Sequence, residues 1–191
     1  MKNIAIFASG NGSNCENIIR YFKQSKLASI AIVICNNEKA KVIERAQKLN
    51  VPVTIISKEE FNNSEIILNI LKENNISLIV LAGFTLFVPK YITEKYDKRI
   101  INIHPSLLPK YGGKGMYGMR VHEAVKENGE RESGITIHYV NSDYDKGQII
   151  KQYTTPINKD DSAEDIAKKV HALEYDYFPK VIESIIKEDG Q

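Results

Sequence analysis

The chain has 191 residues, enough for one well-buried core but too few for two ordinary domains, so we expect a single domain over residues 1–191. Its 26 lysines and arginines against 24 aspartates and glutamates leave a net charge of +2 without a basic block, which argues against a nucleic-acid partner. No apolar run approaches the roughly 18 residues of a membrane span, and the first one is too short for a signal peptide. We therefore expect a cytoplasmic protein with no membrane partner.

Two cysteines, Cys15 and Cys35, are too few for a disulfide framework or a zinc site, and we expect no metal.

Short β-rich runs alternate with helical patterns through the first hundred residues, which is typical of a parallel sheet. We predict strands over 3–8, 30–35, 52–56, 77–82 and 100–104, and helices over 15–25, 38–49 and 63–74. The strands at 30–35 and 77–82 are apolar without alternation, so we place both in the middle of the sheet, covered by helices on both faces.

The pattern changes after the fifth strand. Residues 133–140 alternate apolar and polar side chains, which predicts an antiparallel strand with one wetted face, and 147–155 resembles its partner. Asp161 and Glu164 have capping-box spacing before a long last helix that is bent or restarted at Pro179. The fold class predicted is α/β: a single Rossmann-like domain with a central, mostly parallel sheet flanked by helices and antiparallel strands in its C-terminal part.

The segment "SGNGSN" follows the first strand directly and precedes a helix. Unpaired N–H groups and the helix dipole favour an anion there, so we predict a phosphate-binding loop. A dinucleotide fingerprint does not fit, because its third glycine is replaced by Cys15 and the second strand ends in Cys35, Asn36 and Asn37, where a ribose-binding acid is expected. The alternative is that the glycines only make a tight turn.

Asn102 and His104 lie two residues apart on the fifth strand, so both side chains share one face at the carboxyl end, where α/β sheets bind ligands. An asparagine amide can donate to an oxyanion, and a histidine can exchange protons near pH 7. The alternative is a buried histidine with an internal partner. Asp143 and Asp145 stand in the turn "NSDYDKG". Residue spacing alone does not show which of the two aspartates belongs to a site, and it does not exclude a solvated turn in which neither does. The glycine-dense run at 111–118, with Lys114, is either a mobile flap or a plain surface loop.

Four segments of the chain occur in the order seen in a known family. They are "SGNGSN", "LAGF" at 81–84, "INIHPSLLPKY" at 101–111 and "DYDKGQII" at 143–150. With them the chain resembles the phosphoribosylglycinamide formyltransferases, which belong to the folate-dependent formyltransferases, over nearly its whole length. Many relatives have an arginine soon after "LAGF", where this chain has Leu86, and its segment after "LLPKY" is longer and richer in glycine.

The resemblance implies transfer of a formyl group from 10-formyltetrahydrofolate, as co-substrate, to the amine of glycinamide ribonucleotide in purine biosynthesis. It implies a catalytic set of Asn102, His104 and Asp145. It also implies ribonucleotide contacts from Gly12, Ser13, Asn14 and Glu174, and folate contacts from Thr85, Leu86, Phe87, Val88, Asn102, Asn141, Ser142, Asp143, Tyr144 and Asp145. The partners expected are these small molecules, and the protein is expected to be a monomer or a homodimer.

Our mechanistic hypothesis is that Asn102 and a protonated His104 donate to the tetrahedral oxyanion while Asp145 holds the imidazole. Relatives that act on methionyl-tRNA or hydrolyse formyltetrahydrofolate need a further domain, for which we expect no room in this length. Two alternatives stay open: a formyltransferase-fold enzyme acting on another amine, and a non-catalytic phosphoribosyl-binding module. An NAD-dependent enzyme is disfavoured by the missing fingerprint.

Overall fold

The computed structural model describes residues 1–188, and its contacts divide the chain into two compact units. The first comprises Met1–Ile101 and the end of the last helix from Ile182 onward, and the second comprises Asn102–Val181. The chain therefore passes from one unit to the other within strand β5 (Ile100–His104) and again within helix α7 (Ala163–Glu188).

The first unit is built on parallel strands in the order β3-β2-β1-β4. Their bounds are Lys2–Phe7 for β1, Ala28–Cys35 for β2, Val53–Ile55 for β3 and Ile76–Leu81 for β4. The start of β5 lies beside β4, where the Ile79 N–H donates to the Arg99 carbonyl at 2.9 Å. The two strands predicted to be central, β2 and β4, each have a strand on both sides, as expected from their unbroken apolar runs.

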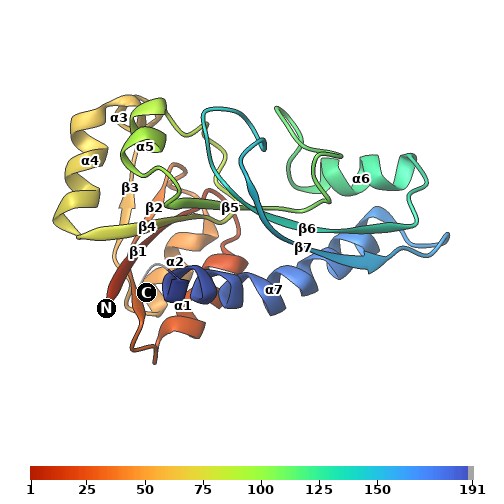
Figure 1. Cartoon of the computed structure of the whole chain (residues 1–191), viewed down its shortest axis with the longest axis horizontal. Coiled ribbons are helices and arrows are strands. Elements are labelled where there is room, and N and C mark those ends of the chain that lie inside the picture. Colours follow the sequence, from red (N-terminus) through yellow and green to blue (C-terminus); the bar gives the residue numbers. More distant parts are fainter. Residues whose placement is uncertain (189–191) are drawn as a thin grey trace. The chain divides into compact units, whose positions relative to one another are not determined.

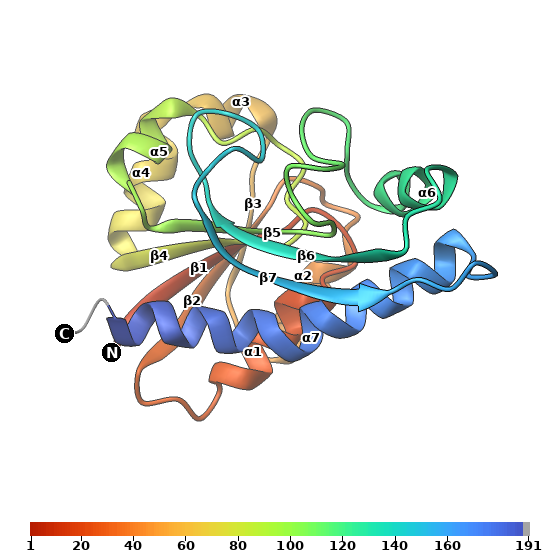
Figure 2. The same ribbon diagram turned by 45° about the vertical axis from the view of Figure 1, so that its right-hand side comes forward.

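Helices cover both faces of these strands, with α1 and α2 on one face and α4 and α5 on the other (Figures 1 and 2). The bounds are Ser13–Phe22 for α1, Lys41–Lys48 for α2, Lys58–Asn62 for α3, Ser64–Glu73 for α4 and Lys90–Lys95 for α5. We predicted α1, α2 and α4 but missed α3 and α5, because helices of five and six residues are too short to show a helical period. The capping box between Ser57 and Glu60 was the available signal for α3.

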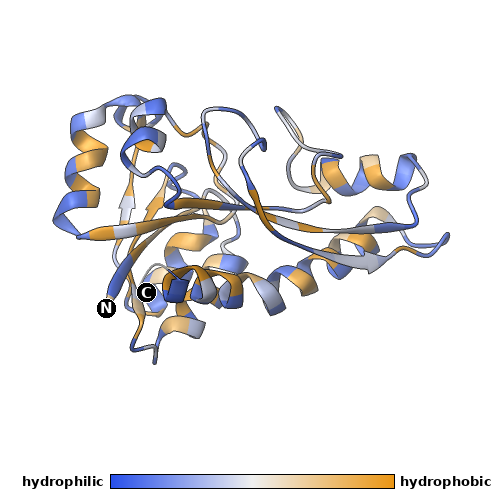
Figure 3. Ribbon diagram, viewed as in Figure 1, coloured by the Kyte–Doolittle hydropathy of each residue, from blue (hydrophilic) through white to orange (hydrophobic). Residues whose placement is uncertain are grey.

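The core of the first unit lies between these layers, and the strands and inner helix faces are hydrophobic (Figure 3). Ile4, Ile6 and Phe7 of β1 are completely buried. Phe84, just after β4, packs edge-on against Phe7 at 5.3 Å and against Phe61 of α3 at 5.1 Å. Such aromatic pairs are worth about 0.5–1.5 kcal/mol beyond their burial, so they hold the loop after β4 in place.

The second unit contains α6 (Met119–Glu127) and an antiparallel pair, β6 (Glu132–Tyr139) and β7 (Ile149–Pro156), seen side by side in Figure 2. The predicted α/β class, mostly parallel with antiparallel C-terminal strands, is confirmed. The expected wetted face of β6 is wrong, because Ser133–His138 are all buried. Thr136 shows why: its hydroxyl accepts the Leu108 N–H at 3.0 Å and donates to the Ser106 carbonyl at 2.7 Å, so the polar face is satisfied internally.

The cap of the last helix, α7, lies one residue later than predicted. The capping box is formed by Ser162 and Asp165, with the Asp165 N–H donating to the Ser162 hydroxyl at 3.1 Å, and not by Asp161 and Glu164. Asp161 is engaged instead by Lys169 and the Asn158 N–H. The helix continues through Pro179. Within residues 1–188, no helix is both long and apolar enough to span a membrane.

Candidate active site

Strand β5 delivers Asn102 and His104 to one face of the second unit, as the strand period requires. His104 is buried and Asn102 is partly buried, and the strand ends at His104, before Pro105. Proline has no N–H for a ladder, so the backbone leaves the sheet immediately after the two polar side chains. Both residues therefore stand at the carboxyl end of their strand.

Asn102 is held by His138, a residue of β6 that we had interpreted as part of a wetted face. The Asn102 Nδ2 and the His138 Nε2 are 3.1 Å apart, and the His138 Nδ1 is 2.8 Å from the Tyr139 carbonyl. A carbonyl can only accept, so the His138 Nδ1 donates to it, and the His138 Nε2 faces the Asn102 amide. This contact fixes the orientation of the Asn102 side chain.

His104 is placed between a backbone carbonyl and a carboxylate. Its Nε2 donates to the Tyr111 carbonyl at 2.7 Å, and its Nδ1 is 3.7 Å from the Asp145 Oδ2. Burial lowers the pKa of His104 below its usual value, although the Asp145 charge and the Tyr111 carbonyl act in the opposite direction. The imidazole is thus mainly neutral at pH 7, and the protonated resting form of our hypothesis is not the one this environment favours.

Asp145 comes from the turn between β6 and β7 and has a left-handed backbone, with φ of 53°. Its Oδ2 accepts the Gly113 N–H at 2.8 Å, and its Oδ1 is 3.6 Å from the His138 Nε2. Burial alone raises the pKa of Asp145, but the contact with His138, the Gly113 N–H and the nearby imidazoles together bring it below its usual value. The structure therefore brings Asn102, His104 and Asp145 into one cluster, with Asp145 ionised.

The glycine-dense segment at 111–118 forms part of this cluster through its backbone. The Tyr111 carbonyl contacts His104, and the Gly113 N–H contacts Asp145. A side chain at Gly112 would meet a Leu108 methyl group at 2.4 Å and Asp145 at 3.4 Å, so it would displace the Leu108 side chain beside Asp145. The start of the segment therefore positions the imidazole and the carboxylate, while Lys114 is exposed.

The other residues predicted in the second unit lie in two places. The exposed part of the β6–β7 turn consists of Asn141, Ser142, Asp143 and Tyr144. Within it, the Asp143 N–H donates to the Asn141 side chain at 3.0 Å. Glu174 is buried on α7 and pairs with the His171 Nδ1 at 2.8 Å, which raises the pKa of His171. The charge of Glu174 also acts on His104, whose pKa it raises.

The predicted phosphate loop lies in the first unit, at the N-terminus of α1. Gly12 is the N-cap, with φ of 76°, and Ser13 and Asn14 open the helix. A glycine N-cap has no side chain to satisfy the first-turn N–H groups, which are the groups that bind anions at helix N-termini. The Glu16 N–H donates to the Gly12 carbonyl at 2.9 Å, so the helix is fully formed from its first turn.

The predicted folate segment Thr85–Val88 also lies in the first unit, after β4. The Thr85 N–H donates to the Ser9 hydroxyl at 2.9 Å, and the Ser9 hydroxyl bonds to the Asn36 side chain. These bonds connect the loops after β1, β2 and β4. Leu86 is half-buried, Phe87 is exposed and Val88 is buried.

Comparison with known proteins identifies the family. The formyl transferase family model matches residues 2–182. The chain belongs to the formyl transferase family. Phosphoribosylglycinamide formyltransferase of Bacillus subtilis is 37% identical over 191 residues, covering 97% of this chain and 95% of that protein. The chain spans only 66% of the chloroplastic phosphoribosylglycinamide formyltransferase of Arabidopsis thaliana, to which it is 34% identical.

Solved structures of related proteins have the same fold as this formyl transferase. Phosphoribosylglycinamide formyltransferase from Anaplasma phagocytophilum is 32% identical, with a TM-score of 0.89, covering 98% of this chain and 88% of that one. The enzyme of that name from Streptococcus pneumoniae TIGR4 is 34% identical, with a TM-score of 0.85, covering 97% and 99%. The family implies a folate-derived formyl donor. In residues 1–188 of this formyl transferase, no three histidines, cysteines, aspartates or glutamates are grouped to hold a metal ion.

Sequence reasoning missed several residues of this formyl transferase that hold others in place. His138 shares the polar face of β6 with Thr136. The alternation of polar and apolar residues in this strand suggested contact with water, but it was equally the available signal for a network of internal hydrogen bonds. The Tyr111 carbonyl and the Gly113 N–H gave no signal, because backbone groups are present at every position. Asn36 was noted only as evidence against a dinucleotide, yet its side chain bonds to Ser9.

Proposed function

We propose that the protein transfers the formyl group of 10-formyltetrahydrofolate to the amine of glycinamide ribonucleotide, giving formylglycinamide ribonucleotide and tetrahydrofolate. The whole chain, residues 1–191, then acts as a single formyltransferase domain in the cytoplasm, as a monomer or homodimer. The observation that carries the proposal is the cluster of Asn102, His104 and Asp145, held by His138 and by the backbone of Gly113. It contains an amide donor, a neutral imidazole and a carboxylate.

The reaction needs no protein nucleophile, because the substrate amine itself attacks the formyl carbon. A new C–N bond forms while the carbonyl electron pair moves to oxygen, and the Asn102 amide donates to the resulting oxyanion. The amine must lose a proton. Neutral His104 is the group able to accept it, and the negative charge of Asp145 stabilises the imidazolium that forms.

Collapse of the tetrahedral intermediate then breaks the bond between the formyl carbon and the folate nitrogen. That nitrogen leaves as an amine and takes up a proton from the His104 imidazolium. His104 is then neutral and Asp145 ionised, as both were before the reaction. Asp145 does not need to be protonated at any step, in agreement with its lowered pKa.

The substrates are assigned to the other predicted residues. Gly12, Ser13 and Asn14 hold the phosphate of the ribonucleotide at the start of α1, and Glu174 contacts the same substrate. Thr85–Val88 and Asn141–Asp145 contact the folate. Each of these segments carries an exposed aromatic side chain, Phe87 or Tyr144, suited to a flat pterin ring.

The test is a steady-state assay of the purified protein with 10-formyltetrahydrofolate, followed by the absorbance of the deformylated folate. We expect turnover only when glycinamide ribonucleotide is present, and a loss of about 10²–10³-fold in kcat for Asn102→Ala. Deformylation without the ribonucleotide would identify a hydrolase. Binding of the ribonucleotide without any deformylation would favour the phosphoribosyl-binding module.

A further inference from the structure

Helix α2 supports the phosphate loop at three points, all within the first unit. The Val42 N–H donates to the Gly10 carbonyl at 3.2 Å. A methyl group on Gly12 would lie 2.5 Å from the Val42 Cβ, so the loop and the first turn of α2 are in direct contact. One turn further on, the Arg45 Nη2 donates to the Asn11 Oδ1 at 3.1 Å. The loop conformation therefore depends on α2 as well as on α1.

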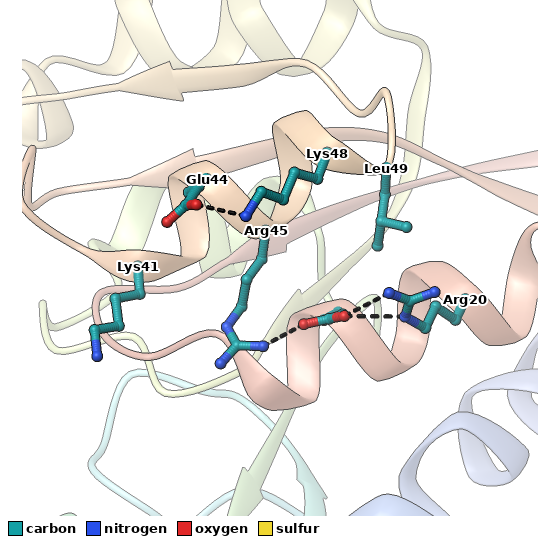
Figure 4. Close-up of a pocket in the computed structure, with 7 residues that line it drawn as sticks. Arg20, Lys41, Glu44, Arg45, Lys48 and Leu49 are labelled. Atoms are coloured by element: carbon teal, nitrogen blue, oxygen red, sulfur yellow. Dashed lines mark hydrogen bonds and ion pairs between the residues drawn. The ribbon is translucent and has the colours of Figure 1, made fainter.

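Arg45 makes a second contact that concerns charge. Its Nη1 pairs with the carboxylate of Glu16, which also accepts from Arg20 at 2.7 Å. In Figure 4, Arg45 reaches across from α2 toward α1, while Arg20 approaches along α1 itself. One guanidinium thus joins a side chain of the phosphate loop to a carboxylate in the first turn of the next helix. Lysine, with a single nitrogen, cannot hold both groups in the same way.

Glu16 needs this partner if an anion is to bind at the same helix end. Hydrogen bonds from Arg20 and Arg45 lower the pKa of Glu16, so it is ionised at neutral pH. It lies one turn from Gly12, where a phosphate dianion would be repelled by a bare carboxylate. The Arg20 side chain is 61% exposed and the Arg45 side chain 35%, so Arg45 is the cation less screened by water.

The surroundings carry excess positive charge. A hollow of about 290 Å³ between α1 and α2 is lined by four basic side chains and two acidic ones, with Leu49. The basic ones are Arg20, Lys41, Arg45 and Lys48. Lys48 pairs with Glu44 one turn earlier on α2, and both side chains are largely exposed. With the Lys48–Glu44 pair balanced, the positive charge of Arg20, Lys41 and Arg45 favours the approach of an anionic substrate to the loop.

We infer that Arg45 is a positioning residue for the phosphate subsite: it fixes Asn11 and neutralises Glu16, so that the loop at Gly12–Asn14 accepts a phosphomonoester dianion. The inference rests on the proposed function for the identity of the complete substrate, but not for the phosphate group. Arg45 acts through Asn11 and Glu16, and it makes no contact with the reacting amine or formyl group.

The test uses ribose 5-phosphate as the probe, titrated calorimetrically into the wild-type protein and its variants. Arg45→Gln should weaken binding about tenfold, the usual size of a lost charge-assisted contact. Arg45→Lys should recover part of the loss. Glu16→Gln should bind at least as tightly as wild type. Adding it to Arg45→Gln should restore part of the lost affinity, because the carboxylate left with Arg20 as its remaining guanidinium partner is then absent.

Lys48→Gln is the matched control, since it removes one positive charge from the same hollow without touching the loop. Its affinity should stay within twofold of wild type. In the formyl-transfer assay, Arg45→Gln should raise KM for the ribonucleotide by about the same factor as the loss of affinity and leave kcat unchanged. A purely structural ion pair would lower the melting temperature without this separation of KM from kcat.

The inference is overturned if Arg45→Gln melts at a lower temperature yet binds ribose 5-phosphate like wild type, or if Lys48→Gln weakens binding equally. It is also overturned if the double variant is no better than Arg45→Gln alone. The binding measurements stand apart from the reaction. Arg45-dependent binding without formyl transfer would support the role of Arg45 and refute the proposed activity, whereas transfer without ribose 5-phosphate binding would refute the role of Arg45.

Discussion

Asp145→Asn separates the charge of the aspartate from its shape. The asparagine oxygen can still accept the Gly113 N–H, which is 2.8 Å from the carboxylate in the structure, so the turn should keep its conformation. The negative charge 3.7 Å from the His104 Nδ1 is lost. The imidazolium that forms when His104 takes up the amine proton then has no counter-charge.

The expected size follows from Coulomb's law. Two unit charges 3.7 Å apart attract each other by about 4 kcal/mol at an effective dielectric constant of about 20, and both side chains are largely shielded from water. Because each 1.36 kcal/mol is worth a factor of about ten, kcat should fall by about 10³-fold. The pKa of His104 should fall as well, because the Asp145 charge favours the protonated ring.

The assay is formyl transfer at saturating substrates, together with an NMR titration of the His104 ring in both proteins. Asp160→Asn, in an exposed turn of the same unit, is the control for loss of one negative charge and should be nearly fully active. A folded Asp145→Asn enzyme that retains more than a tenth of wild-type kcat would refute the reasoning. An unchanged His104 pKa would show that the imidazole does not sense the carboxylate.

Three further predictions concern the supporting residues. In Gly12→Ala, the new methyl group would stand on a left-handed backbone with φ of 76° and press against the first turn of α2. The free energy of unfolding measured in urea should therefore drop by about 2–4 kcal/mol. Gly10→Ala, with open space around the new methyl group, should change the free energy of unfolding little. His138→Phe removes the hydrogen-bond partner that orients Asn102 and should reduce kcat about 10–100-fold with KM unchanged, as steady-state kinetics would show. Burial lowers the pKa of His122, so the unfolded chain takes up a proton first as pH falls below about 6.5; His122→Gln should therefore lose less stability between pH 7 and pH 5 in thermal melts.

The sequence predicted the elements whose pattern is long enough to be periodic. Strands β1, β2, β4 and β5 appeared as apolar runs, and α1, α2, α4 and α7 as helical ones, because burial of a continuous face leaves a visible period. Short helices α3 and α5 leave none. The wetted face assigned to β6 failed because alternation reports which side chains are polar and says nothing about whether water or Ser106 satisfies Thr136.

The candidate site was predicted in the same partial way. Strand period alone joined Asn102 to His104, since residues two apart share a face. Asp145 stands 41 positions after His104, and residue spacing could not choose it over Asp143. The choice came from the family resemblance, and the structure places the Asp145 carboxylate 3.7 Å from the imidazole while Asp143 is exposed. The Gly113 N–H that holds the carboxylate could not have been predicted, because a backbone amide carries no residue signal.

The most direct test of the formyl-transfer proposal follows the formyl carbon itself. The purified protein would be mixed with 10-formyltetrahydrofolate labelled with ¹³C in the formyl group and with glycinamide ribonucleotide, and the carbon signal followed by NMR. The account predicts that the label moves to the amide of formylglycinamide ribonucleotide, one formyl group for each tetrahydrofolate formed. Appearance of the label as free formate, or its retention on the folate in the presence of the ribonucleotide, would contradict it.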